Sequence, residues 1–425
     1  MPTSAAEQPD SAWAEAAAWA RSGVMGLGGW PDGPPVLPPW GLPQRLDDLV
    51  RDIEQQSAAS GPAVRVSWAA ALGGRAALLD LARAGRISAN GSCRLLRASD
   101  GWVALNLARA GDRDLVEALS GRDVTDPWRD AADHAARATA DDFVARARLL
   151  GLGAARLPGP DIQIGTDPWT IVDRCHRGGD SADAPWMVVD LSSLWAGPVA
   201  AHVLGAAGAQ VIKIESPARP DGARSSPAFY RWVHRSDEVT ESIDLRGSGR
   251  QRAATLIDEA DVVIEGSRPR ALEQLGLGPA DRVGKPGQVW LSITGYGRAT
   301  TERDWVAFGD DAAVAGGLVG WDQTGDPVFL GDAIADPLTG LVGALAVLRA
   351  RKAGGGQLID VAMSRVAAAM ALGSGGPPAG RQMAAIVERD GAGGWQVRVG
   401  NAAERVRTQP PTFEWVSARR QSLPR

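Results

Sequence analysis

Asp336 carries a carboxylate that can act as a nucleophile. Pro337 and an apolar run typical of a helix follow it, which predicts Asp336 at the N-cap and Pro337 at the first helical position. The partial positive charge of a helix N-terminus favours an ionised carboxylate, the form that attacks a carbonyl carbon. A simple role as a helix cap explains the same residues, and the local sequence by itself favours that interpretation.

A second candidate site is the turn at 189–198, which reads VDLSSLWAGP. It lacks the G-x-G-x-x-G pattern, so a nicotinamide cofactor is not expected. Ala196, Gly197 and Pro198 predict a tight entry into a helix whose free backbone N–H groups can face a phosphate. An ordinary helix start without a ligand is the alternative.

The elements that must position these residues alternate along the second half of the chain. Short apolar runs predict strands at 187–190, 210–215, 242–245, 261–265, 288–293 and 358–361. Helical patterns lie between them at 198–207, 249–259, 270–275 and 337–351. Such alternation predicts an α/β fold with a parallel, doubly wound, Rossmann-like sheet.

Two composition breaks divide the chain, a Pro-rich stretch at 31–43 and a polar Gly/Asp/Pro segment at 158–185. Between them, a helical region at 46–84, a strand at 102–107 and amphipathic helices up to Leu152 predict a smaller α+β domain. We therefore expect an N-terminal unit at 1–157, a linker at 158–185, a Rossmann-like domain at 186–370 and an irregular C-terminal tail at 371–425.

The sequence also contains an internal echo. The segment Ser22–Val36 parallels Ala315–Val328, with Gly-rich turns, a tryptophan and a Pro-Val pair in the same order. When the two copies are aligned without a gap from Pro35 and Pro327, Gln44 stands opposite Asp336. The first copy would therefore lack the candidate carboxylate.

Composition excludes several classes of function. The 425 residues carry a net charge of -5 with no dense stripe of Lys and Arg, which argues against a nucleic-acid partner. No apolar run reaches the roughly 18 residues of a spanning helix, so no membrane association is expected. Cys93 and Cys175 stand alone and far apart, which predicts a reduced, cytoplasmic protein without a structural metal site.

Seven segments together resemble the class III CoA-transferases, in the order and spacing of that family. They are DLSSLWAGP (190–198), AQVIKIE (209–215), ADVVIEGSRP (260–269), LGLG (275–278), LSITGYG (291–297), GDAIADPLTG (331–340) and GGQLIDV (355–361). The segment CRLLRASDGWVAL (93–105) resembles the start of the family's small domain. In ordinary members the small domain follows the Rossmann-like part, so this chain looks permuted.

The resemblance implies an enzyme that moves coenzyme A from an acyl-CoA donor to a carboxylic acid acceptor, with Asp336 as the covalent nucleophile and no metal. By the same resemblance, Ala196, Gly197, Pro198, Arg224 and Arg268 would contact CoA, and the backbone of Gly295 and Gly297 would stabilise oxyanions. The family's interlocked dimers imply a homodimer, or a heterodimer with a related subunit. The acyl groups are not indicated by any residue.

Two alternatives stay open. The α-methylacyl-CoA racemases of the same fold carry a histidine where this chain has Asp310, so racemase chemistry, which needs two acid/base groups, is the less favoured activity. Asp310 and Asp311 are expected to be a solvated pair at a helix N-terminus, with a catalytic role as the alternative. A non-catalytic subunit is the second possibility, since Ser236–Glu238 replaces a lysine that relatives commonly carry before the strand at 242–245.

Overall fold

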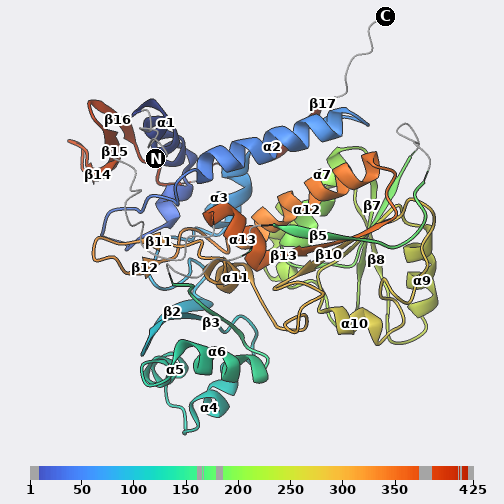
Figure 1. The fold of residues 1–425 in the computed structure, drawn as a ribbon, viewed down its shortest axis with the longest axis horizontal. Coiled ribbons are helices and arrows are strands. Elements are labelled where there is room, and N and C mark those ends of the chain that lie inside the picture. The colour runs from blue at the N-terminus through green and yellow to red at the C-terminus, as the bar shows by residue number, and fades with distance from the viewer. Residues whose placement is uncertain are drawn as a thin grey trace, which may run out of the picture.

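A seven-stranded sheet forms the centre of the protein (Figure 1). The computed structural model describes residues 9–159, 165, 167–178, 185–372, 385–409, 411 and 414–419. Across the sheet the order is β5 (Trp169–Asp173), β13 (Gln357–Ala362), β10 (Val289–Thr294), β9 (Val262–Glu265), β6 (Met187–Asp190), β7 (Gln210–Glu215) and β8 (Val239–Ser242). All neighbours are parallel except β5, which pairs antiparallel with β13 at the edge. The predicted α/β fold with a parallel sheet is confirmed.

The strand order reverses at a defined point of the sheet, between β6 and β9. From β6 the chain first builds outward through β7 and β8, and then returns to add β9, β10 and β13 on the other side. In doubly wound sheets, ligands bind beyond the carboxyl ends of the strands where the order reverses. The loops after β6 and β9 therefore meet at the expected binding edge.

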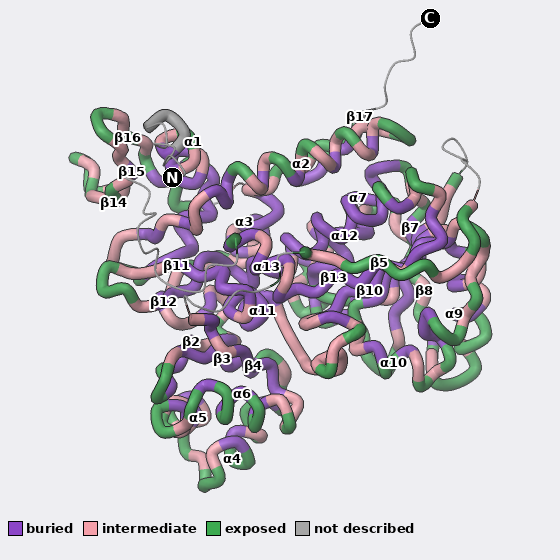
Figure 2. Tube along the Cα trace, in the orientation of Figure 1, coloured by how far each residue is buried: buried purple, intermediate pink, exposed green. Residues whose placement is uncertain are grey.

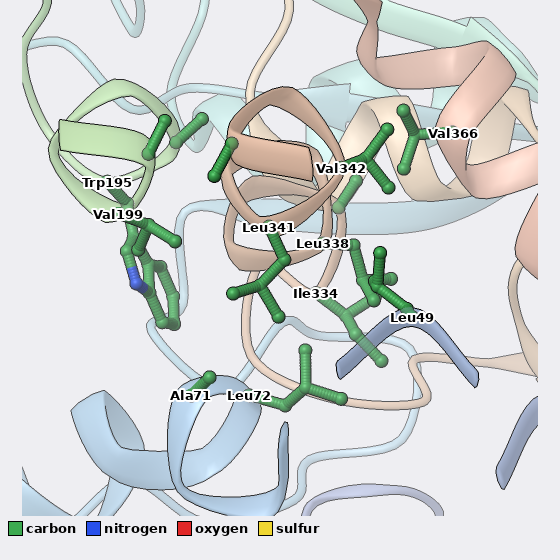
Figure 3. Packing of buried hydrophobic residues seen from close by; sticks show 14 of the residues in the cluster. Leu49, Ala71, Leu72, Trp195, Val199, Ile334, Leu338, Leu341, Val342 and Val366 are labelled. Atoms are coloured by element: carbon green, nitrogen blue, oxygen red, sulfur yellow. The ribbon is translucent and has the colours of Figure 1, made fainter. Parts of the chain in front are cut away.

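Helices cover both faces of this sheet. One face carries α7 (Ala196–Ala206), α12 (Ala335–Lys352) and α13 (Met363–Ala371), and the opposite face carries α9 (Arg250–Glu259) and α10 (Pro269–Glu273). Figure 2 shows that α12 is buried along nearly its whole length. Figure 3 shows why, because α12 packs among Val199 of α7, Val366 of α13 and the N-terminal helices that carry Leu49 and Leu72.

The internal echo corresponds to a repeat in the order of elements. The first copy runs α1 (Pro9–Ser22), η1 (Val24–Leu27), α2 (Leu42–Ala58), β1 (Ala63–Val66) and α3 (Trp68–Leu78). The second runs α11 (Gly309–Ala315), β11 (Gly320–Trp321), β12 (Pro327–Val328), α12, β13 and α13. In each copy the strand has an antiparallel partner from elsewhere in the chain, β17 (Val416–Arg419) on β1 and β5 on β13.

A separate three-stranded sheet forms the smaller unit at the bottom of Figure 1. It consists of β2 (Cys93–Ala98), β3 (Gly101–Asn106) and β4 (Gly153–Arg156), all antiparallel, with α4 (Leu115–Ser120), α5 (Pro127–Ala135) and α6 (Ala140–Leu149). Its own core includes Leu105, Leu119 and Phe143. We call this unit, residues 93–156, the small domain; β3 and β4 lie against α11.

Four local expectations differ from the structure. The helical region at 46–84 is interrupted by β1, and the strand expected at 242–245 lies at 239–242. The segment expected to be a linker contributes β5 to the main sheet. The part of the expected irregular tail that is described contains β14 (Ile386–Arg389), β15 (Trp395–Val399), β16 (Ala402–Arg405) and β17.

The C-terminal strands are stabilised by packing against the core of the rest of the chain, because their own sequences contain few apolar residues. Val397, Val406 and Trp415 are buried in the same large cluster as α1 and α7. Short strands with few apolar residues give little periodic signal, so their pairing depends on surfaces far away in sequence. Residues 373–384, 410, 412–413 and 420–425 of the expected tail lie outside the described residues.

Among the described helices, none combines the length and apolarity needed to cross a membrane.

Gly340 lies where α12 and α7 are in close contact, and its substitution should destabilise the protein. A Cβ atom at Gly340 would lie 2.4 Å from the backbone oxygen of Ala196 and 2.6 Å from Val199 Cβ. Backbone cannot move aside cheaply, so we expect Gly340→Ala to lower the free energy of unfolding by about 1–3 kcal/mol, measured by denaturant titration.

The matched control is Gly101→Ala, because a Cβ at Gly101 meets nothing within 4 Å. Its effect should stay within about 0.5 kcal/mol. If Gly340→Ala proved as stable as the parent, the helix pair would be more loosely packed than the contacts indicate.

Candidate active site

Four aspartates come together where α11 and α12 begin. Asp310 and Asp311 lie in the first turn of α11, Asp332 in the loop before α12, and Asp336 in the first turn of α12. We call these four residues the carboxylate cluster. Asp311 and Asp332 are fully buried, Asp310 is 2% exposed, and Asp336 alone is partly exposed. The expectation of a solvated Asp310–Asp311 pair is therefore wrong, because β3 and β4 of the small domain cover the start of α11.

Asp336 is in the first helical turn but is not the helix cap. Helix α12 begins one residue earlier, with Ile334 at the N-cap, because the N–H of Asp336 already bonds to the oxygen of Ala333. Asp336 Oδ2 accepts a hydrogen bond from the N–H of Gly309 at 3.1 Å. A Cβ on Gly309 would lie 2.5 Å from the same oxygen, so glycine is required there. Burial raises the pKa of Asp336 to about 7, against the lowering effect of Arg75.

The small domain and the loop that leads into it supply amide donors to α11. Asn106 of β3 donates to Asp311 Oδ1 at 3.0 Å, and the N–H of Phe308 donates to the same oxygen at 3.0 Å. Asn90 donates to Asp310 Oδ2 at 3.2 Å. Burial raises the pKa of both aspartates to about 7 despite these donors. The site thus depends on both units of the chain.

Arg75 is the cation that the described residues bring to the cluster. It extends from α3 of the first copy, and its Nη1 lies 3.3 Å from Asp332 Oδ1. Neither oxygen of Asp332 has a well-formed hydrogen bond, and burial raises the pKa of its carboxyl group while Arg75 opposes the shift. No motif in the sequence pointed to Arg75, Asn90 or Asn106. Asp332 lies in the family-like segment 331–340, and this position was a signal for a second candidate carboxylate beside Asp336.

The turn predicted to face a phosphate lies next to the cluster. Ala196, Gly197 and Pro198 form the first turn of α7, and the oxygen of Ala196 touches Gly340, one helical turn beyond Asp336. Gly197 must be glycine, since a Cβ there would lie 1.8 Å from Ser192 Oγ. The structure therefore brings three predicted cofactor residues beside the predicted nucleophile.

A fully buried lysine holds this turn in place. Lys213 donates to the oxygen of Ser192 at 2.9 Å and pairs with Asp190 at 3.5 Å and Asp221 at 3.3 Å. Burial alone would lower the pKa of Lys213, but the neighbouring carboxylates outweigh it and raise the pKa. Asp221 also accepts from the N–H of Leu194 at 2.9 Å, so the loop after β6 is bonded to a charged network beneath it.

Arg224 is engaged within the protein. It follows β7 in the short helix η2 (Gly222–Ser225), and its guanidinium donates to both oxygens of Glu215 at 2.7 and 2.8 Å. Tyr230 of α8 (Pro227–Val233) also donates to Glu215 at 2.9 Å. Although burial opposes it, the bond from Arg224 lowers the pKa of Glu215 to about 2. The side chain of Arg224 remains 44% exposed, so it can still reach a ligand.

Arg268 lies in a basic cleft between the small domain and the main sheet. The cleft has a volume of about 750 Å³. Its cationic residues are Arg109 and Arg148 from the small-domain side and Arg268 and Arg270 at the start of α10. Trp305 forms part of the wall, and Arg148 stacks over its ring at 3.6 Å from the centroid.

The two glycines expected as oxyanion donors, Gly295 and Gly297, lie in the loop that follows β10. The N–H of Gly297 already donates to Thr294 Oγ1 at 2.9 Å, and Gly297 has a φ of 107° that favours glycine. Gly295 packs so that an added Cβ would lie 2.6 Å from Ala307 Cβ. The backbone N–H group that donates to Asp336 is that of Gly309, which was not among the expected donors. The described residues contain no group of three or more His, Cys, Asp or Glu arranged to hold a metal ion.

Comparison with known proteins places this site in a family. The model of CoA-transferase family III matches residues 185–409, more than half of the chain and the whole stretch from β6 through the cluster. The chain belongs to CoA-transferase family III. The match includes Asp336 and the turn at 196–198 as well as Arg268.

Individual members of family III match about half of this chain. The succinyl-CoA–L-malate CoA-transferase alpha subunit of Chloroflexus aurantiacus is 34% identical over 229 residues, covering 48% of this chain and 52% of that protein. The beta subunit of the same organism is 36% identical over 197 residues, covering 41% and 47%. A crystal structure of a CAIB/BAIF family protein from Brucella suis matches 43% of this chain and 53% of that one, with 29% identity and a TM-score of 0.39. The chain spans about half the length of the curated relatives it matches.

Asp311 offers a test of the buried cluster that does not depend on activity. A carboxyl group whose folded pKa lies near 7, above its unfolded value near 4, makes the protein lose stability as pH rises through that interval. Asp311→Asn keeps the Oδ1 acceptor for Phe308 and Asn106 but removes the ionisation. We expect the variant to match the parent near pH 4.5 and to exceed it by a few kcal/mol near pH 8.

Denaturant titrations at a series of pH values measure this difference. The control is Asp114→Asn, at the start of α4 and away from the cluster, which should track the parent at every pH. Parallel curves for the parent and Asp311→Asn would show that Asp311 ionises without the cost that its burial implies.

Proposed function

We propose that this protein transfers coenzyme A from an acyl-CoA to a carboxylic acid through a covalent intermediate on Asp336. The observation that supports it best is the setting of Asp336 within the family-matched region. Among the four clustered carboxyl groups it alone is partly exposed, and it lies in the first turn of α12, beside the turn at 196–198. A nucleophile must be reachable as well as held in place, and a helix N-terminus favours its anionic form.

The proposed reaction is a relay of acyl transfers. The Asp336 carboxylate attacks the thioester carbonyl, the C–S bond breaks, and an anhydride and a CoA thiolate form. The thiolate attacks the aspartyl carbonyl of the anhydride, which releases the donor acid and leaves an aspartyl-CoA thioester. The acceptor carboxylate attacks that thioester, and the freed thiolate then attacks the acceptor's acyl carbon. New acyl-CoA leaves and the Asp336 carboxylate is regenerated.

The basic cleft is the proposed binding place for the phosphates of CoA. Its lining carries four arginines against two aspartates, Asp112 and Asp304, so the cleft keeps a net positive charge that suits a polyanion. Guanidinium groups bind phosphate oxygens with paired, charge-assisted hydrogen bonds. The cleft wall at Trp305 is four residues from Gly309, whose N–H bonds to Asp336. Four residues span at most roughly 14 Å, so an elongated molecule can reach from the cleft to the carboxylate.

We also propose that the domain order is a permutation and that the chain works with a second chain, either a copy of itself or a related subunit. The relatives named as alpha and beta subunits support the second part of this proposal. So does β5, an open sheet edge on which Ile171 is 50% and Val172 57% exposed, since such edges are commonly covered by another chain.

The nucleophile is tested by exchanging single carboxylates for amides. Asp336→Asn should reduce CoA transfer by several orders of magnitude while the protein stays folded, because the amide cannot attack the thioester. Succinyl-CoA is a suitable first donor in a panel of acyl-CoAs, followed by mass spectrometry of the intact protein for an adduct on Asp336. Since Asp336 must be ionised, parent activity should rise with pH through about 7.

Asp332→Asn is the matched control, because Asp332 belongs to the same cluster but is fully buried. If Asp332→Asn abolishes transfer and adduct formation while Asp336→Asn retains a tenth or more of the parent rate, Asp332 is the nucleophile instead. Steady exchange of the α-proton of a 2-methylacyl-CoA for deuterium would favour the racemase alternative.

The cleft is tested by Arg268→Gln. Loss of one charge-assisted phosphate contact should weaken CoA binding about ten- to a hundredfold and reduce its salt dependence, measured by calorimetry at several salt concentrations. Arg129→Gln, on the exposed side of α5, changes the net charge equally and should bind CoA as the parent does. Equal affinities for the two variants would place the phosphates elsewhere.

A further inference from the structure

The first copy of the repeat contributes a residue to the site of the second copy. Its helix α2 carries Gln44 where α12 carries Asp336, so the first copy has no carboxylate at that position. Its helix α3 nevertheless points toward the cluster of the second copy, and Arg75 lies in its last turn. A segment without a carboxylate at the matching position therefore still reaches the site that contains Asp336.

The packing of α3 fixes where Arg75 lies. Ser67 caps the helix by accepting a hydrogen bond from the N–H of Ala70. Gly74 lets the helix approach α8 closely, since a Cβ there would lie 2.3 Å from Trp232. The guanidinium of Arg75 then stacks at 5.2 Å from the ring centroid of Trp195 and 5.6 Å from that of Phe229. Figure 3 shows Ala71 of the same helix on the side of α12 where Trp195 lies.

Arg75 thus touches both halves of the site. On one side is Trp195, which immediately precedes the turn at 196–198, and on the other is Asp332 at 3.3 Å. The guanidinium side chain is 18% exposed, and Asp332 is fully buried. Breaking a buried charge pair by removing one partner leaves an uncompensated charge, which the protein avoids by taking up a proton.

We propose that Arg75 is a positioning residue of the CoA-transfer site: it holds Asp332 as an anion and supplies the positive charge that lets Asp336 ionise. The proposal rests on the proposed function, since it concerns the same carboxylate cluster. Arg75 lowers the pKa of Asp332, Asp336 and Asp310, each of which burial raises. The other groups that face the cluster are neutral amides or acids: Asn90, Asn106, Asp311, Cys93 and Tyr296, with Arg148 behind Tyr296.

Arg75→Met tests the proposal because it removes the charge and keeps an apolar stem against Trp195. Arg75 lowers the pKa of Asp336, so without its charge the acidic limb of the activity profile should move upward, by about one pH value or more. At pH 7 the transfer rate should fall roughly five- to fiftyfold and recover as pH rises. Arg75→Lys keeps the positive charge, so the midpoint of the acidic limb of its activity profile should lie within about half a pH value of that of the parent.

The matched control is Arg65→Met in β1. Arg65 belongs to the same copy and pairs with Glu54 on the surface at 2.6 Å, so the same change in charge should leave the profile unmoved. Where Arg75→Met does not fold, Arg75→Gln takes its place, since it is also neutral and keeps a polar end at a partly exposed position.

An infrared titration of protonated carboxyl groups separates this proposal from the proposed function. In Arg75→Met the band of protonated carboxyl groups should persist to higher pH than in the parent, whether or not either protein transfers CoA. A parent without transfer activity but with this shift would contradict the proposed function and support the role of Arg75. An active parent whose profile and infrared titration both stay unchanged in Arg75→Met would overturn the role of Arg75.

Discussion

Four carboxyl groups share one buried place, and their mutual repulsion is the constraint on which the site is built. Like charges out of water disfavour ionisation strongly, so such a cluster is stable only if donors and cations reach it. Backbone N–H groups of Gly309 and Phe308 reach it from the loop before α11. Asn106 reaches it from the small domain, and Arg75 from the N-terminal helices. No single segment carries all of these groups, so the cluster exists only when the whole chain is folded around it.

The helices also pack closely at the start of α12. Gly340 allows α7 to lie against α12, which brings the turn at 196–198 within one helical turn of Asp336. Beneath that turn, Lys213 is bonded to Ser192 and paired with Asp190. A buried ion pair contributes little net stability, but it fixes geometry. The network therefore holds the loop that leads into the proposed CoA-binding turn in one position.

The repeat gives the N-terminal segment a place in this arrangement. The alignment of the two copies sets Gln44 opposite Asp336, and the first copy packs against α12 through α2 and α3. Two copies of one unit lie in a single chain, and the cation and the candidate nucleophile are divided between them. The two copies are also alike in their edge pairing. Strand β17 pairs antiparallel with β1 of the first copy, and β5 pairs antiparallel with β13 of the second.

The sequence by itself determined the parallel α/β sheet, the strand β3, the helix that carries Asp336 and the family, because these depend on short-range periodicity and on motifs that lie close together in the chain. It also located Arg268 and the turn at 196–198, which the structure places at the cleft and at the cluster respectively. Only the tertiary structure decided that Asp310 and Asp311 are buried, and that Arg75 reaches Asp332 from more than 250 residues away. Burial and ion pairing of this kind arise from surfaces that meet only on folding. The residues that flank Arg75 in the sequence therefore do not indicate its role in the site.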